Sequence, residues 1–214
     1  MPKGFTDDEK KIITKKLIEE CKYSWQRYGY KKTSVDELCK NAGISKGAFY
    51  IFFKTKEELF YNTLKEVQEN LYKVVEEKIA INPNKNGVAD ALKEIFSEYN
   101  NSSFMYDTKS VDFISFFNKL SEEERNDLSN KSYIGAKGML DKPFLKLKIE
   151  EDLAISVLSA LLITITQKDS MLCDPINVFD FMIDNLIDSI FESVKLIWKN
   201  SLIFHRIARS LKII

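Results

Sequence analysis

The sequence predicts an all-α protein, and three observations carry this prediction. Only 7 Gly and 4 Pro occur in 214 residues, so few positions interrupt regular structure. Apolar residues recur three and four positions apart along most of the chain, which is the period of an amphipathic helix. No segment of any length shows the alternation of apolar and polar residues that is typical of a strand.

Composition places the chain among ordinary soluble proteins, with 44% hydrophobic and 30% charged residues. The N-terminus has no apolar signal region, so export is not expected. The longest apolar stretch, residues 153–166, contains Ser and Thr and falls short of the roughly 18 residues that indicate a membrane span. Cys21, Cys39 and Cys173 are odd in number and widely spaced, which favours reduced thiols in a cytoplasmic protein.

The charge is balanced overall but unevenly distributed. Residues 1–60 hold 13 Lys and Arg against 9 Asp and Glu, which leaves 19 basic and 23 acidic residues in the remainder. A basic N-terminal segment on an acidic body indicates an anionic partner for that segment. Chance variation explains so small an excess equally well.

Capping boxes mark several helix starts. In each box a Ser or Thr hydroxyl accepts from the amide three residues later, and a Glu at that position reaches back to the cap amide. The sequence contains Thr6-x-x-Glu9, Ser34-x-x-Glu37, Thr55-x-x-Glu58 and Ser121-x-x-Glu124. The first helix is expected over 7–28 and ends at Gly29, which accepts a left-handed conformation.

The remaining helices follow from periodicity and from breakers. Residues 82–87 form a loop by composition, Pro143 ends one helix, and Asp174-Pro175 separates the last two. The expected helices cover about 35–41, 46–52, 56–81, 88–103, 107–120, 122–140, 150–169 and 177–200.

The helix at 46–52 is too short to build a core by itself. Gly43 allows a turn before it, Ser45 can cap it, and Phe49 and Phe53 lie four apart and can anchor one face. The other positions, which present thin side chains at the N-terminal end, are Lys46, Gly47, Ala48, Tyr50 and Phe52. A narrow first turn is what a helix needs to reach base edges in the major groove. A three-helix bundle without a nucleic-acid role has the same spacing.

Individual side chains on this segment suit DNA. Lys46 can reach a guanine edge or a phosphate, and the Ala48 methyl suits a thymine methyl. The Tyr50 hydroxyl can donate to a phosphate. Lys56 lies in the first turn of the next helix, where its ammonium and the free amides can hold a phosphate together.

Residues 33–60, TSVDELCKNAGISKGAFYIFFKTKEELF, resemble the DNA-binding signature of TetR-type bacterial transcriptional regulators. The resemblance implies an N-terminal helix-turn-helix domain, residues 1–55, and a larger helical domain for effector binding and dimerisation, residues 56–214. It implies that Thr33 or Ser34 caps a helix and touches a backbone phosphate. The recognition turn is then Ser45, Lys46, Gly47, Ala48 and Phe49, and Tyr50 and Lys56 become phosphate contacts.

Two residues depart from the family pattern. Cys39 replaces a small Ala on a packed face, which is a tolerable change. Phe52 occupies a place where such proteins often carry His or Tyr, and Phe cannot make the polar contact with the DNA backbone. Members of the family act as homodimers, usually as repressors released from a pseudo-palindromic operator by a small molecule. The resemblance therefore implies double-stranded DNA, a second copy and a small-molecule effector as partners.

The middle of the chain is rich in aromatic residues and Met, which predicts a pocket for a small apolar or aromatic ligand. The same residues suit plain core. The candidate lining residues are Phe104, Tyr106, Phe113, Phe117, Tyr133, Met139, Thr164 and Gln167.

The last two helices, about 150–200, are apolar enough to pair across a two-fold axis as a four-helix bundle, although a monomeric interior can use the same pattern. The tail, residues 201–214, is apolar and basic at helical spacing. It suits a partner helix or a membrane surface, or it simply continues the last helix.

Catalysis is not expected. The single His is His205, and no nucleotide-binding glycine loop or paired nucleophile and base is present, so no cofactor or metal is expected either. Ligand entry is expected to shift the helix at 56–81 and move the DNA-binding domains apart. A DNA-bound scaffold or an activator that works through a protein partner without a ligand is the alternative.

Overall fold

The structure is a computed structural model that describes residues 5–101 and 103–192, with the side chains of 103 and 104 excepted. Throughout these ranges the chain is helical and forms no strand, which confirms the predicted all-α class. The helices are α1 (Asp7–Lys32), α2 (Val35–Ala42), α3 (Lys46–Phe52), α4 (Lys56–Ile81), α5 (Lys85–Asn101), α6 (Ser103–Tyr106), α7 (Val111–Phe117), α8 (Glu122–Leu140), α9 (Glu151–Ile163), the 3-10 helix η1 (Thr164–Ser170) and α10 (Pro175–Ile190).

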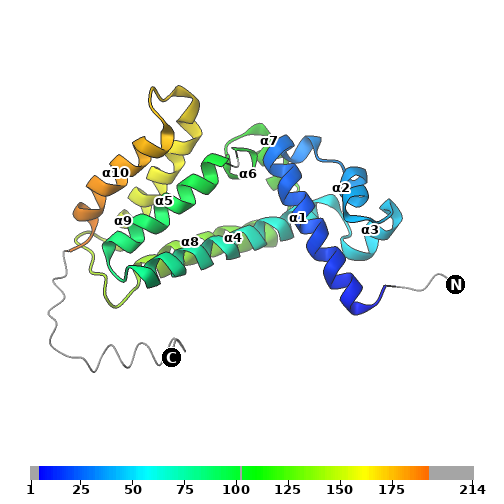
Figure 1. Ribbon diagram of the computed structural model, residues 1–214, viewed down its shortest axis with the longest axis horizontal. Helices are drawn as coiled ribbons and strands as arrows, with labels where there is room; N and C mark the ends of the chain where they lie inside the picture. The colour runs from blue at the N-terminus through cyan, green and yellow to red at the C-terminus, as the bar shows by residue number, and fades with distance from the viewer. Residues whose placement is uncertain (1–4, 102, 193–214) are drawn as a thin grey trace.

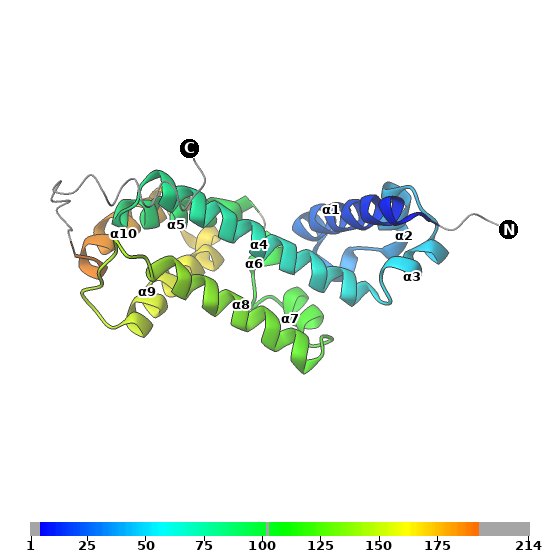
Figure 2. The same ribbon diagram turned by 90° about the horizontal axis from the view of Figure 1, so that it is seen from below.

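The molecule is elongated, with a small group of helices at one end (Figure 1). Helices α1, α2 and α3 form that end, and α4 leads from it into the larger group of α5, α8, α9 and α10. In the turned view α8 follows α4 along its length, while α7 lies near the junction of the two groups (Figure 2). One long helix therefore belongs to both ends of the molecule.

The predicted capping boxes are formed at two of the four positions. Thr6 with Glu9 and Ser121 with Glu124 make the full reciprocal pair. The Ser34 hydroxyl accepts instead from the Asp36 amide at 3.2 Å, so the prediction of a box with Glu37 is wrong. At Thr55 only half of the box exists, because the Glu58 carboxylate accepts from the Lys54 amide at 2.6 Å.

Several helix limits differ from the predicted ones for local reasons. The segment 107–120 holds only α7, which starts at Val111 because the Ser110 hydroxyl caps it by accepting from the Phe113 amide. The segment 150–169 changes from α to 3-10 geometry at Thr164. Helix α10 starts early, with Pro175 at its first position, where proline loses no hydrogen bond. Residues 193–200 of the last predicted helix and the tail 201–214 lie outside the described residues.

Two apolar clusters hold the fold. The first surrounds Trp25 and contains Leu38, Phe49 and Phe60 from the N-terminal helices together with Phe113 and Phe116 of α7. The second joins the end of α4 with α5, α8, α9 and α10, and the rings of Phe96 and Phe179 stack at its centre at 4.0 Å. Helix α7 thus packs into the N-terminal cluster although it lies far along the chain.

Candidate nucleic-acid interface and ligand cavity

Helices α2 and α3 form a helix-turn-helix. Gly43 ends α2 in the left-handed conformation, with φ 77 and ψ 30, and its amide bonds back to the carbonyls of Cys39 and Lys40. This is the glycine turn that the sequence predicts. The Ser45 hydroxyl then caps α3 by accepting from the Ala48 amide at 3.2 Å. The turn therefore fixes where α3 begins.

Helix α3 is held from beneath by aromatic side chains. Phe49 is fully buried and Phe53 nearly so, and their ring centroids are 6.0 Å apart. Phe49 belongs to the predicted recognition turn by sequence position, but its side chain packs into the core and supports the helix. Phe52 and Ala48 are half-buried, and the Phe52 ring contacts Phe5 at 5.4 Å, so the predicted exposed face is narrower than expected.

The outer face of α3 carries Lys46, Gly47, Tyr50 and Ile51. Tyr50 is 55% exposed and Ile51 is 61% exposed. Ile51 was missed by the sequence reasoning, although its position two residues after buried Phe49 places it on the opposite side of the helix. An exposed Ile beside Tyr50 adds an apolar surface that suits a thymine methyl.

Lys46 is exposed and makes an ion pair with Asp36 of α2, with 2.9 Å between Nζ and the carboxylate. The hydrogen bond that Lys46 donates to Asp36, followed by the charge of Asp36, raises the pKa of Lys46. The side chain is therefore cationic. Exposed pairs of this kind contribute little stability, so a phosphate or guanine edge can replace Asp36 as partner without a large penalty.

The two predicted cap residues at the start of α2 differ in accessibility. Thr33 is 4% exposed, and its hydroxyl donates to the Gly29 carbonyl at 2.8 Å. Ser34 is half-buried and caps the Asp36 amide. Of the two, Ser34 is the side chain placed to meet a phosphate, whereas Thr33 braces the end of α1.

Lys56 lies in the first turn of α4, as predicted, but its ammonium turns toward α1. Nζ donates to the Tyr30 carbonyl at 2.5 Å and lies 4.2 Å from the centroid of the Tyr30 ring. Desolvation by burial lowers the pKa of Lys56. A phosphate contact by this side chain requires it to leave Tyr30.

A cavity of about 560 Å³ lies in the larger group of helices. Its wall combines residues of α4 to α9 and η1. Four predicted residues stand in this wall, namely Tyr106, Phe113, Phe117 and Met139. The volume falls within the range of roughly 300–1,000 Å³ that is typical of small-molecule sites.

The other predicted lining residues lie elsewhere. Tyr133 lies on the solvent side of α8. The side of that helix that lines the cavity is formed by residues 128, 132, 135, 136 and 139. Thr164 and Gln167 are placed by 3-10 geometry, so the α-helical spacing used to predict them does not hold there. Thr164 donates to the Leu161 carbonyl at 2.7 Å instead. The side chain of Phe104 lies outside the described residues.

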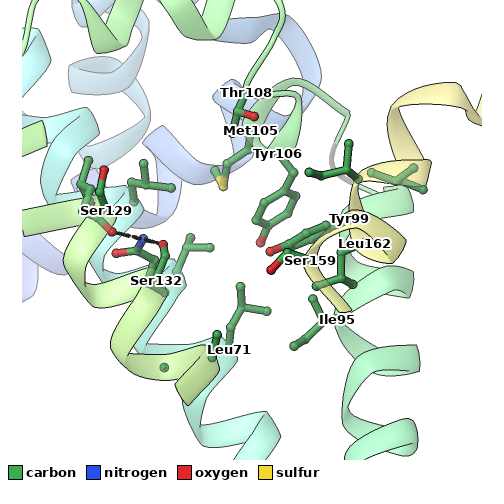
Figure 3. Close-up of a pocket in the computed structure, with 18 of the residues that line it drawn as sticks. Leu71, Ile95, Tyr99, Met105, Tyr106, Thr108, Ser129, Ser132, Ser159 and Leu162 are labelled. Atoms are coloured by element: carbon green, nitrogen blue, oxygen red, sulfur yellow. Dashed lines mark hydrogen bonds between the residues drawn. The ribbon is translucent and has the colours of Figure 1, made fainter. Parts of the chain in front are cut away.

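Sequence reasoning missed the α4 and α5 side of the cavity. Gln68, Leu71 and Tyr72 of α4 and Ile95 and Tyr99 of α5 line it. The signal was present as helical spacing along 64–75, but that spacing indicates only burial and does not distinguish a cavity wall from core. Figure 3 shows Leu71, Ile95 and Tyr99 around the open space.

Helix α7 connects the cavity with the helix-turn-helix unit. The side chains of Phe113 and Phe117 line the cavity, whereas Phe116 packs on the Trp25 ring, with centroids 5.0 Å apart. The Asp112 carboxylate accepts from the backbone amides of Tyr30 at 2.6 Å and Lys31 at 2.9 Å. One short helix therefore touches both the ligand space and the end of α1.

A second tie follows α7. Lys119 donates to the Tyr30 hydroxyl at 2.8 Å and forms an ion pair with Glu57 of α4 at 3.2 Å. The Tyr30 hydroxyl also bonds to the Glu57 carboxylate. Asp112 and Lys119 thus attach the two ends of the α7 segment to the junction of α1 and α4.

Helices α9 and α10 expose apolar side chains in the single chain. Phe181 is 72% exposed, and Leu153 and Ile163 are about half exposed. The segment Glu151–Ser170 is long and apolar enough to cross a membrane by length and composition, and only 22% of that window is buried. Residues 5–101 and 103–192 leave this apolar face uncovered.

The fold and the exposed α3 define a helix-turn-helix protein with a helical body. The model of the family described as bacterial regulatory proteins, tetR family, matches residues 18–62. Residues 18–62 are thus similar to the DNA-binding region of that family.

Two related sequences match the chain over short segments. The chain is 35% identical over 91 residues to the uncharacterised HTH-type transcriptional regulator YhgD of Bacillus subtilis. The matched segment covers 41% of this chain and 46% of YhgD. The chain is 46% identical over 50 residues to YuxN of the same organism, which covers 23% of this chain and 17% of YuxN. The chain thus spans about half of the first relative and less of the second.

Solved structures match over most of the chain and show the fold. FadR from Bacillus subtilis, solved in complex with stearoyl-CoA, has a TM-score of 0.63 at 18% identity, covering 82% of this chain and 98% of FadR. NalD from Pseudomonas aeruginosa, the secondary repressor of the MexAB-OprM multidrug efflux pump, has a TM-score of 0.52 at 16% identity, covering 88% and 100%. NemR from E. coli has a TM-score of 0.60 at 20% identity, covering 81% and 96%.

Proposed function

We propose that this protein is a cytoplasmic homodimeric repressor that a small apolar or aromatic ligand releases from a pseudo-palindromic operator. The observation that carries the proposal is the double contact of α7. Phe113 and Phe117 stand in the cavity wall, while Asp112 bonds to the backbone where α1 ends. A ligand that moves α7 therefore acts directly on the helix-turn-helix unit.

The DNA contacts come from α3 and its surroundings. Lys46, Gly47 and Ala48 present the first turn to base edges, and Tyr50 and Ile51 extend that surface. Ser34 contacts a phosphate from the start of α2. Lys56 contacts a phosphate once its ammonium has left the Tyr30 carbonyl. The helix-turn-helix domain comprises residues 1–55 and the effector domain residues 56–214.

The second copy covers the apolar face of α9 and α10. Leu153, Ile163 and Phe181 need a partner, and two copies related by a two-fold axis bury the same residues from each chain. Such a dimer reads two half-sites about 34–36 Å apart, one turn of DNA, or a multiple of that spacing. Movement of α4 and α7 in each copy changes this spacing and lowers operator affinity.

The ligand-release step rests on the cavity and on the fold neighbours. NalD is described as a repressor, and FadR was solved with an acyl-CoA. In this chain the cavity of about 560 Å³ has a largely apolar wall that includes Phe113, Phe117 and Met139. Ligand binding needs to favour the released arrangement by only a few kcal/mol to clear an operator.

Selection of bound duplexes from a random pool tests the DNA-binding part. The expected product is one symmetric sequence with two half-sites. Lys46→Ala and Tyr50→Phe are expected to weaken its binding, each by about 1–3 kcal/mol if the lost contact is to a base. Loss at one base position identifies base readout, and uniform loss identifies a phosphate contact. Enrichment of no sequence at low salt would contradict the proposal.

A second candidate is a DNA-bound scaffold or activator that works through a protein partner. Val111 and Ile114 on α7 and Ile134 on α8 are exposed apolar side chains in the region expected to contact such a partner. Operator affinity that stays constant with every cavity ligand would favour this candidate, and the sign of regulation then depends on where the operator lies.

A further inference from the structure

The cavity has a distinctive polar side. Tyr99 of α5 and Tyr106 of α6 stack with ring centroids 4.1 Å apart, and both line the cavity. Figure 3 shows their hydroxyl groups pointing into the open space, with the Ser159 hydroxyl of α9 directed to the same region. Three separate helices thus bring three hydroxyl groups to one side of the cavity, which we call the hydroxyl cluster.

The hydroxyl cluster has unused hydrogen-bond donors. Within residues 5–101 and 105–192, neither tyrosine hydroxyl nor the Ser159 hydroxyl has a hydrogen-bond partner. Tyr99 and Tyr106 are half-buried and Ser159 is exposed, so these hydroxyl groups are free to take a hydrogen-bond partner from a ligand. The third tyrosine in the wall, Tyr72, does have one, since its hydroxyl donates to the Lys131 carbonyl.

The cluster is neutral. Burial, followed by the charge of Tyr72, raises the pKa of Tyr99 to about 12, and burial also raises the pKa of Tyr106. Both phenols therefore keep their protons at physiological pH and act as donors. Lys109 is the charged residue among those that line the described cavity, and it is exposed. No charged side chain belongs to the hydroxyl cluster itself, so a neutral acceptor is expected to bind there better than an anion.

On the opposite side, the Gln68 amide offers no free donor. The side-chain amide of Gln68 on α4 is already hydrogen-bonded within the protein. Its Nε2 donates to the Leu128 carbonyl at 3.2 Å and to the Ser132 hydroxyl at 2.9 Å. Leu71, Ile95 and Leu162 form apolar wall between the two sides (Figure 3). Compared with Gln68, the hydroxyl cluster is therefore the side with donors available to a ligand.

We infer that Tyr99, Tyr106 and Ser159 bind an uncharged oxygen acceptor, a ketone, quinone, ester or amide carbonyl, carried on an apolar or aromatic ligand. This inference rests on the proposed function, because it names the chemistry of the ligand that fills the same cavity. Tyr99 and Tyr106 supply the hydrogen bonds, and the apolar wall takes the rest of the molecule.

Three two-ring compounds test the inference on the full-length protein. Benzophenone has the carbonyl, diphenylmethane has the same skeleton without oxygen, and diphenylacetate carries an anion. Calorimetric titration is expected to give benzophenone a dissociation constant about five- to tenfold below that of diphenylmethane, the effect of one net hydrogen bond. Diphenylacetate is expected to bind more weakly than benzophenone.

Matched variants locate the effect. Tyr99→Phe combined with Tyr106→Phe removes both phenol donors and keeps the rings, so the preference for benzophenone over diphenylmethane should disappear. Tyr72→Phe removes a hydroxyl that is already engaged with Lys131, so the preference should persist. A preference that survives in the double variant, tighter binding of diphenylacetate, or no binding of any of the three compounds would overturn the inference.

Operator binding is measured separately on the selected duplex. Benzophenone that binds with the expected preference but leaves operator affinity unchanged supports the hydroxyl cluster and contradicts the release mechanism. If the wild-type protein binds the operator but shows no preference for benzophenone over diphenylmethane, the hydroxyl cluster is contradicted and the DNA-binding part of the proposed function still stands.

Discussion

Some positions of the chain strongly favour one residue type, and Gly29 is the clearest case. It interrupts α1 with φ 77 and ψ 171, a combination that is essentially restricted to glycine. A Cβ placed there would come within 2.7 Å of Asp112 Oδ2. Gly43 also has φ 77, but its ψ of 30 is the ordinary left-handed region, and no atom lies within 4 Å of an added Cβ.

Gly29→Ala is therefore expected to lower the free energy of unfolding by roughly 3 kcal/mol, since backbone strain and displacement of Asp112 add together. Gly43→Ala is the control and should lose only about 1 kcal/mol. Urea unfolding followed by circular dichroism measures both. Equal losses in the two variants would show that the contact with Asp112 contributes nothing.

The three thiols differ in reactivity because they differ in burial. Cys173 is exposed, whereas Cys21 and Cys39 are buried. Burial raises the pKa of Cys21 to about 12. A thiol-specific chromogenic reagent at pH 8 is expected to label one residue quickly and the other two only on unfolding. Cys173→Ser should abolish the fast phase, and a fast phase that remains would contradict the burial of Cys21 and Cys39.

The same pKa shift predicts a pH dependence of stability. The folded state keeps the Cys21 proton between about pH 9 and about pH 12, while the unfolded chain releases it from its ordinary value of 9.0. The unfolded state thus binds fewer protons in this window, and the free energy of unfolding falls as pH rises, by at most about 1.4 kcal/mol per pH unit. Cys21→Ala should show a shallower fall than wild type in denaturant titrations. Identical slopes would contradict the assignment.

Sequence reasoning placed the outer residues of α3 well and the cavity poorly. Lys46 and Tyr50 are exposed as expected, because helical spacing from Phe49 and Phe53 separates the two faces. Tyr99 was not predicted as a lining residue, because an apolar helical face looks the same whether it packs against core or borders a space. Lys56 was placed correctly in the chain, but its bond to the Tyr30 carbonyl depends on tertiary packing.

At the scale of elements, helix limits were predictable where side-chain caps set them. Helix α8 begins at Glu122 with the predicted box at Ser121, and α4 covers the predicted span. The prediction failed where geometry changed within an apolar run, as at Thr164, because apolar spacing does not encode the shift from α to 3-10. The role of α7 was also beyond the sequence, since its bonds to α1 join residues about 80 positions apart.

Helix α7 is expected to transmit ligand binding through Asp112. Asp112→Ala removes the acceptor for the Tyr30 and Lys31 amides, so the end of α1 loses its attachment to the cavity wall. We expect operator affinity to fall several-fold, by about 1–2 kcal/mol, while benzophenone affinity changes less than twofold. Fluorescence anisotropy with the selected operator measures the first quantity, and calorimetry measures the second.

Asp107→Ala is the matched control, because this carboxylate lies in the same connection but accepts from the Lys109 amide of its own turn. Its operator affinity should equal that of wild type. If Asp112→Ala behaves like Asp107→Ala, α7 does not control the helix-turn-helix unit, and α4 alone carries the movement.

At the scale of the whole molecule, the proposed dimer depends on the apolar face of α9 and α10. Helix α10 buries Phe179, Ile183 and Ile187 against its own chain, yet it leaves Phe181 72% exposed. A helix that is apolar beyond its core-facing side needs a second partner. A second copy and a lipid surface both supply an apolar environment, but only a second copy gives operator half-sites their symmetry.

Phe181→Glu is expected to convert the dimer to monomer, because two charges would face each other across the two-fold axis without counter-charges. Sedimentation velocity at micromolar concentration measures this, and operator affinity should fall with it. Leu172→Glu is the control, since Leu172 is fully exposed in the turn before α10 and should leave the dimer intact. A Phe181→Glu protein that remains dimeric would place the interface elsewhere, and wild-type protein that floats with lipid vesicles would assign the face of α9 to a membrane.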